Sequence, residues 1–293
     1  MSFSTLQHQA DSLSAGLPPL MIAADHLAAS VSLGVHGRKR AGMGESFWQF
    51  RRYGPHDSAS AIDWRQSARS SHIFVREREW EGAQTVWFWR DASAGMNFKS
   101  DKVSKRGRAE LLLLALASLL VRGGERVGFP GMEGAPAASR LALARIGRAL
   151  FAPQHHGAAA MPPHAPLSRG SHLVWFSDFL DPAAPEDMKR LAGEGIHGHL
   201  VRIIDPAEED FPYHGRTRFE SPQGDADEVF GRAERVRQAY RARFAAHGEA
   251  ITAAAMALGW TATVHRTDRA PQQALIALHA ALANDLANDL GSG

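Results

Sequence analysis

The chain has 293 residues, of which 44% are hydrophobic and 22% are charged, proportions that fit one main globular domain with a small appendage. The absence of cysteine excludes disulfides, thiolate catalysis and cysteine-ligated zinc or iron–sulfur sites. The formal net charge is only +2, so the chain as a whole is not a polycation and nucleic-acid binding is disfavoured.

Residues 1–19 are polar and irregular, and they predict a flexible N-terminal arm. They lack the basic start and the long apolar segment of a secretory signal. The longest apolar run, residues 111–121, is too short to cross a bilayer, which needs about 20 apolar residues. We therefore expect a cytoplasmic protein without membrane insertion.

Residues 42–64 mix glycine, proline, serine and aromatic residues in a pattern that predicts turns and short strands. We expect a small, mostly β subdomain over residues 20–84. Residues 23–33 fit a short helix or a first strand, and residues 73–80 alternate as a strand does. Between Arg38 and Arg78 nine basic residues stand against four acidic ones, so this subdomain carries a local excess of positive charge.

In residues 85–290 strand-like and helix-like segments alternate, which is the pattern of an α/β domain with a doubly wound, mainly parallel sheet. The strands are expected at residues 86–90, 126–129, 172–176, 199–204 and 261–265, with a further edge strand at 216–220. The helices are expected at residues 105–122, 141–151, 185–192, 227–258 and 271–290.

Two aspartates, Asp91 and Asp178, follow predicted strands. Because all strands of a parallel sheet end at one edge, both carboxylates can face one site. Close carboxylates repel each other, so such a site needs a bound cation, a basic side chain or a shared proton. A competing interpretation is that both side chains only cap helices and accept backbone N–H bonds at strand ends.

Ser93 lies in the sequence ASAG, which is similar to the nucleophile elbow of serine hydrolases except that Asp91 replaces the elbow's first glycine. Asp205 and His265 follow in an order that suits an acid and a base. A metal-dependent or serine hydrolase that uses Asp91, Ser93 and Asp178 is therefore the alternative to a non-enzymatic function.

An ordered series of motifs crosses the basic subdomain and enters the α/β domain. It consists of GMGESF at residues 42–47, RRYGPHD at 51–57, IDWRQSAR at 62–69, VRE at 75–77 and DAS at 91–93. This series resembles the family known as domain of unknown function 58, and the similarity extends over most of residues 35–282. The resemblance implies a von Willebrand factor A-like fold for the α/β domain.

In von Willebrand A-like domains an Asp-x-Ser-x-Ser turn, a distant threonine and a second aspartate form a metal-ion-dependent adhesion site. The resemblance places Asp91, Ser93 and Asp178 at the first aspartate, the first serine and the second aspartate. Gly95 stands at the second serine, and the threonine has no counterpart except a serine such as Ser139. Since water must replace each missing ligand, we expect no required cofactor and only weak Mg²⁺ or Mn²⁺ binding.

The basic motif has three interpretations. Arg65 and Arg69 lie four residues apart beside Asp63 and Trp64, which suits an internal network of charge-assisted hydrogen bonds. The same residue types suit a partner-docking surface, because tryptophan and arginine are common interface anchors. Stacking on nucleic-acid bases is the third and least favoured interpretation. The residues concerned are Arg51, Arg52, Asp57, Asp63, Trp64, Arg65 and Arg69.

The family resemblance also implies a partnership with a MoxR-type AAA+ ATPase, a chaperone-like machine. We therefore expect a non-enzymatic protein-interaction module, an adaptor or co-chaperone that works with this ATPase through a degenerate adhesion-type site. The sequence identifies no client protein.

Overall fold

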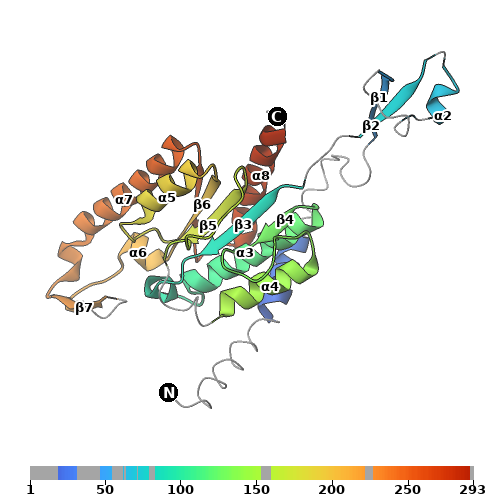
Figure 1. Ribbon diagram of the computed structural model, residues 1–293. Helices are drawn as coiled ribbons and strands as arrows, with labels where there is room; N and C mark the ends of the chain where they lie inside the picture. Colours follow the sequence, from blue (N-terminus) through green and yellow to red (C-terminus); the bar gives the residue numbers. More distant parts are fainter. Residues whose placement is uncertain are drawn as a thin grey trace. The chain divides into compact units, whose positions relative to one another are not determined.

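The computed structural model (Figure 1) describes residues 19–31, 47–54, 62, 64–70, 72–78, 83–152, 160–221 and 227–290. The chain divides into two units, which we call the α/β unit (Met1–Val35 with Gln84–Gly293) and the motif unit (His36–Ala83). This division differs from the sequence-based grouping of residues 20–84, because residues 19–31 belong to the α/β unit.

Five parallel strands form the sheet of the α/β unit. In spatial order they are β4 (Arg126–Gly128), β3 (Thr85–Arg90), β5 (His172–Ser177), β6 (His197–Ile204) and β9 (Thr261–Arg266). The central strands are buried on both faces, which explains their nearly continuous apolar sequences. The chain runs from β3 outward to β4 and then returns to β5, so β3 and β5 flank the topological switch point of a doubly wound sheet. The expected α/β class is confirmed.

Helices cover both faces of this sheet (Figure 1). One face packs against α3 (Lys105–Arg122), which contacts α4 (Arg140–Phe151) and α8 (Pro271–Leu290). The other face carries α5 (Ala184–Gly193) and α7 (Arg237–Ala257). Among the described residues, no helix is both long and apolar enough to span a membrane.

The helix over residues 19–31 packs against α3 and adds a further layer to the core. Its residues Leu27 and Val31 are buried. Asp25 accepts a 2.8 Å hydrogen bond from the hydroxyl of Ser118 and forms a 3.1 Å ion pair with Arg122. With neighbours on all sides, α3 is buried around most of its circumference, which accounts for its run of leucines. The sequence left residues 23–33 open between helix and strand, and the structure selects the helix.

The segment expected to be a helix over residues 227–258 begins instead with a strand, β8 (Asp227–Phe230), and only α7 is helical. β8 pairs antiparallel with β7 (Thr217–Glu220) in a separate two-stranded sheet, so residues 216–220 do not extend the main sheet. Helix propensity is overridden here by the pairing and by an edge-to-face contact between Phe219 and Phe230, whose ring centroids are 5.7 Å apart.

The described part of the motif unit is a small hairpin with one helical turn. β1 (Phe47–Arg52) pairs antiparallel with β2 (Phe74–Arg78), and α2 (Trp64–Ser67) lies between them in sequence. The hydroxyl of Ser67 accepts a 2.8 Å hydrogen bond from the backbone N–H of Phe74, which fixes α2 to the start of β2.

Candidate functional site

The first part of the site is the carboxylate of Asp91, directly after β3. The side chain is buried, with 1% of the residue exposed. Its Oδ1 accepts a 2.7 Å hydrogen bond from the backbone N–H of Ser93, and its Oδ2 accepts a 2.6 Å bond from the hydroxyl of Ser177. Since Ser177 ends β5, this bond links the ends of the two strands at the switch point.

Asp178 supplies the second carboxylate. Its Oδ1 accepts a 3.0 Å hydrogen bond from the backbone N–H of Leu180. A Cβ atom added to Gly95 would lie 3.2 Å from Asp178 Oδ2 and 3.9 Å from Ser93 Oγ, so the turn after β3 lies directly against Asp178. The structure therefore brings Asp91, Ser93 and Asp178 together at the carboxyl edge of the sheet.

The turn that carries Asp178 is held in an uncommon backbone conformation. Phe179 has a φ of 55°, in the left-handed region, where a bulky residue is strained by roughly 1–3 kcal/mol. Its backbone N–H donates to Ser177 Oγ at 2.8 Å, and His247 Nε2 on α7 lies 2.7 Å from its carbonyl oxygen. These bonds fix the direction in which Asp178 and Leu180 leave the strand.

Lys105 provides a cation that the sequence analysis did not identify. It is the first residue of α3, it is 1% exposed, and its Nζ lies 2.8 Å from Asp178 Oδ2 and 2.5 Å from Glu208 Oε1. Burial acts to lower the pKa of Lys105, but the charges of Asp178 and Glu208 outweigh it and the net pKa is raised. The ammonium group therefore stays charged.

The end of β6 completes the cluster through the short helix α6 (Pro206–Asp210). Asp205 caps this helix and accepts hydrogen bonds from the backbone N–H groups of Ala207 and Ser100, both at 2.9 Å, and from the Ser100 hydroxyl. Glu208 closes a capping box with the backbone N–H of Asp205 and extends its other oxygen to Lys105. Three strand ends thus contribute acidic side chains to one edge of the sheet.

Asp91 differs electrostatically from its neighbours. Burial raises the pKa of Asp91, the charge of Asp178 adds to this rise, and hydrogen bonds from Ser177 and Ser93 oppose it. Within the described part of the chain its carboxylate has no ion-pair partner, whereas Asp178 and Glu208 share Lys105. The surroundings of Asp91 therefore disfavour its charged form.

These residues do not fit a divalent cation well. Asp178 Oδ2 already binds the Lys105 ammonium group, Gly95 offers no hydroxyl, and the Ser139 hydroxyl caps α4 by accepting a 3.2 Å bond from Ala142. No group of three or more histidine, aspartate or glutamate side chains suited to a metal occurs among the residues that the structure describes. A metal ion that used Asp178 would have to displace a buried lysine.

We therefore expect the melting temperature in EDTA to lie within about one degree of that in millimolar Mg²⁺ or Mn²⁺. A ligand stabilises a protein only in proportion to its binding. The Lys105→Ala variant is the matched control, because it removes the competing ammonium group. A shift of many degrees in the unsubstituted protein that disappears in Asp178→Ala would contradict this expectation.

The hydrolase alternative finds no relay in this geometry. Asp205 is engaged with Ser100 and with the start of α6, and His265 Nε2 lies 3.3 Å from Arg108. Among the described residues, neither is hydrogen-bonded to Ser93. Asp205 and His265 thus belong to hydrogen-bond networks other than that of Ser93.

The chain matches a family model described as "Protein of unknown function DUF58" over residues 49–250. It belongs to this family. The match covers both the motif unit from β1 onward and the site at the carboxyl edge of the sheet.

Curated relatives of this DUF58 member include uncharacterized proteins of Mycobacterium tuberculosis (Rv1480) and Mycobacterium bovis (Mb1516). Each is 25% identical over 244 residues, which is 78% of this chain and 76% of the relative. Among solved structures, BatB of Bacteroides thetaiotaomicron matches with a TM-score of 0.39 and 15% identity, over 69% of this chain and 100% of BatB. An aerotolerance-related membrane protein of Bacteroides fragilis matches with a TM-score of 0.38 and 18% identity, over 70% of this chain and 100% of that protein. Structural similarity at this level carries no argument about this chain.

The structure describes the exposure of only some of the motif residues in the motif unit of this DUF58 member. Trp64 is 67% exposed, and Arg65 and Arg69 are exposed as well. The docking surface and the internal network both stay predictions. The side chains of Arg51 and Arg52, and the whole of Asp57 and Asp63, lie outside the described residues, as do Gly42 and Gly44 of the first motif.

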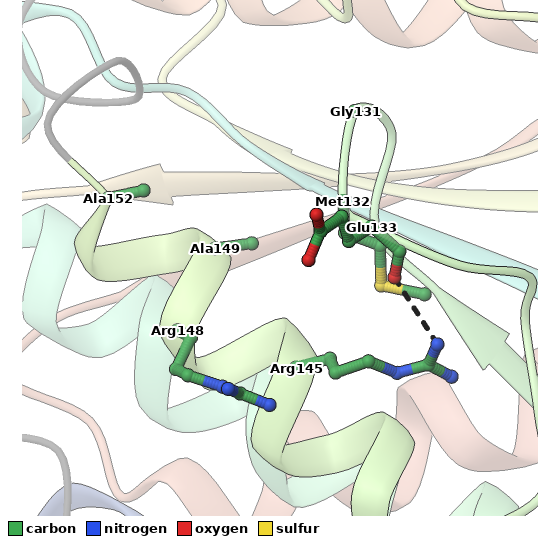
Figure 2. Close-up of a pocket in the computed structure, with 7 residues that line it drawn as sticks. All are labelled: Gly131, Met132, Glu133, Arg145, Arg148, Ala149 and Ala152. Carbon is green, nitrogen blue, oxygen red and sulfur yellow. Dashed lines mark hydrogen bonds between the residues drawn. The ribbon is translucent and has the colours of Figure 1, made fainter.

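A separate hollow lies beside α4 and the loop before it (Figure 2). Arg145 crosses it and donates hydrogen bonds to the carbonyl oxygens of Glu133, at 3.2 Å, and Ala135, at 2.9 Å. Arg148 donates a 3.4 Å bond to the carbonyl of Ala144. Arg145 therefore holds the loop before α4, whereas Arg148 bonds within the helix, and we assign the hollow no ligand.

Lys105 and Glu208 were missed because their pairing joins segments about a hundred positions apart in sequence. One signal was available. A lysine in the first turn of a helix is unfavourable against the positive end of the helix dipole, so Lys105 required an acidic partner. Glu208 follows Asp205 by three residues, which is the spacing of a capping box, but that pattern gives no sign of a bond to α3.

Proposed function

We propose that this protein is a non-enzymatic interaction module, an adaptor or co-chaperone that docks a MoxR-type AAA+ ATPase at the carboxyl edge of its sheet. Asp91, Ser93 and Asp178, with Lys105, form the rigid base of the docking site. The family resemblance supplies the partner, and the arrangement of exposed side chains around the base supports the location.

The observation that carries the proposal is a set of exposed apolar side chains attached to the charged cluster. Phe98, Val103 and Leu180 are all partly exposed. The backbone carbonyl of Phe98 accepts a 3.2 Å hydrogen bond from the N–H of Lys105, Val103 stands two residues before Lys105, and the N–H of Leu180 donates to Asp178. The backbones of Phe98 and Leu180 are therefore bonded to residues of the cluster, and Val103 lies close to Lys105 in sequence.

This arrangement has the anatomy of a protein interface. Apolar anchors in well-supported positions contribute most of the binding energy of typical interfaces, and polar groups around them give orientation. The internal lysine offsets one of the two negative charges of Asp178 and Glu208 without a metal ion, so docking does not require one. The half-buried Ser93 remains at the surface of the cluster to contact the partner.

Leu180→Asp is expected to weaken binding of the MoxR-type ATPase from the same cells at least tenfold, or about 1.4 kcal/mol, because it puts a charge at an apolar anchor. Its melting temperature should change little, since Leu180 is 48% exposed. Isothermal titration calorimetry measures the affinity. Leu141→Asp on α4 is the matched control, because Leu141 is also exposed but lies away from the cluster. Equal affinities for the two variants would place the docking site elsewhere.

A further inference from the structure

A second site is indicated by an open cavity of about 700 Å³ along α7. Its sheet side is formed by Arg202, Ile204 and Val264, and its helix side includes Phe244 and Met256. Val264 and Met256 are large apolar side chains that remain exposed there. The volume lies in the range of small-molecule pockets, about 300–1,000 Å³, and the lining is mainly apolar.

Arg202 is the unusual member of this lining. It is 7% exposed, and its guanidinium carbon lies 4.6 Å from the centroid of the Phe244 ring. Its Nε and Nη2 atoms are buried and have no hydrogen-bond partner in the described part of the chain. Together Nε and Nη2 form one edge of the guanidinium, the edge that can bind both oxygens of a carboxylate. A buried charge without such a partner is costly.

The acidic side chains nearest to Arg202 are already bound to other cations. Asp178 and Glu208 bind Lys105, and Glu209 lies 2.7 Å from Arg266. Burial lowers the pKa of Arg202, and the charges of these three carboxylates oppose the change only in part. The described residues therefore bury the guanidinium of Arg202 here without supplying a carboxylate that pairs with its Nε and Nη2.

Gly248 shows that α7 makes room for the guanidinium. A Cβ atom at this position would lie 1.9 Å from Arg202 Nη1. Glycine inside a helix is destabilising relative to alanine, so its presence in α7 is explained by the space that Arg202 needs. The Nε–Nη2 edge without a partner and the close approach of Gly248 to Nη1 are two separate observations about the same guanidinium.

We propose that this cavity binds a small carboxylate that carries an apolar chain. The guanidinium of Arg202, whose Nε and Nη2 are covered in this structure, turns so that both atoms pair with the carboxylate, and the apolar chain lies over Ile204, Val264 and Met256. This site uses residues apart from the docking surface and holds whether or not the ATPase is the partner.

Octanoate is a suitable probe, with octanamide as the uncharged analogue of equal length. Calorimetry and the ¹³C shift of carboxyl-labelled octanoate should show saturable binding to the full chain and at least tenfold weaker binding of octanamide. Arg202→Met should reduce octanoate affinity at least tenfold. Arg241→Met should not, because Arg241 is an exposed residue at the edge of the same cavity.

Gly248→Ala is the second variant, since its methyl group forces the guanidinium to move while the charge is retained. It too should lower octanoate affinity, and a thermal melt of each variant shows that it is folded. The proposal is overturned if octanoate shows no saturable binding, if octanamide binds equally well, or if Arg202→Met and Arg241→Met have equal effects.

Discussion

Replacing Lys105 by methionine should lower the free energy of unfolding by about 3–5 kcal/mol at neutral pH, the usual effect of removing one partner from a buried ion pair. The substitution leaves Asp178 and Glu208 close together without a cation, and both are largely buried. Because the pKa of Lys105 is raised, its contribution is fully present below the ordinary lysine pKa and is lost only as pH rises through the raised value. The loss should therefore be seen across the neutral and mildly alkaline range, by urea unfolding.

The control is a variant that removes both sides of the pair. Lys105→Met combined with Asp178→Asn and Glu208→Gln should recover most of the lost stability, because neutral groups of the same shape carry no uncompensated charge. A loss of less than 1 kcal/mol in Lys105→Met alone would show that the ammonium group is not the cation of the cluster.

The second large effect is a loss of stability in acid that involves His199. This residue is buried on β6, with its Nε2 3.1 Å from His172 Nδ1 and its Nδ1 2.9 Å from the hydroxyl of Thr261. Asp285 is more distant, at 3.7 Å, and is partly exposed. Burial lowers the pKa of His199 to about 3, and neighbouring histidines add to this shift.

The sign follows from proton uptake by the unfolded chain. The unfolded state binds a proton below an ordinary histidine pKa of about 6.5, whereas folded His199 stays neutral down to about 3. Stability is thus present above pH 6.5 and is lost as pH falls, by about 2 kcal/mol for this one group at pH 5. Urea unfolding at pH 7.5 and pH 5 measures it. His199→Gln should reduce the pH-dependent loss by about 2 kcal/mol, and an unchanged pH dependence would contradict this assignment.

The fold was predictable because the strands and helices of the α/β unit carry strong local patterns. The buried strand ends at Asp91 and Asp178 could also be predicted, since parallel strands end at a common edge. The strand pairing of residues 227–230 could not, because it depends on contact with residues 217–220 and not on local propensity. The same reason applies to helix 19–31, whose bond to Ser118 joins distant segments.

The site was predictable in its acidic residues and not in its cation. The alternatives of a bound cation, a basic side chain or a shared proton were all compatible with two neighbouring carboxylates. The structure places a basic side chain, Lys105, at Asp178. No periodicity or local spacing connects the start of α3 to the end of β5, because the contact exists only in the folded sheet.

The measurement that tests the docking site most directly is titration of the full chain with the MoxR-type ATPase, once in Mg²⁺ and once in EDTA. Nucleotide-free ATPase should be used in both titrations, so that its own Mg²⁺–nucleotide complex does not change between them. We predict equal affinities in the two conditions, with binding weakened at least tenfold in Leu180→Asp and retained in Leu141→Asp. Binding that disappears in EDTA, or that survives Leu180→Asp unchanged, would contradict a metal-independent docking site supported by Lys105.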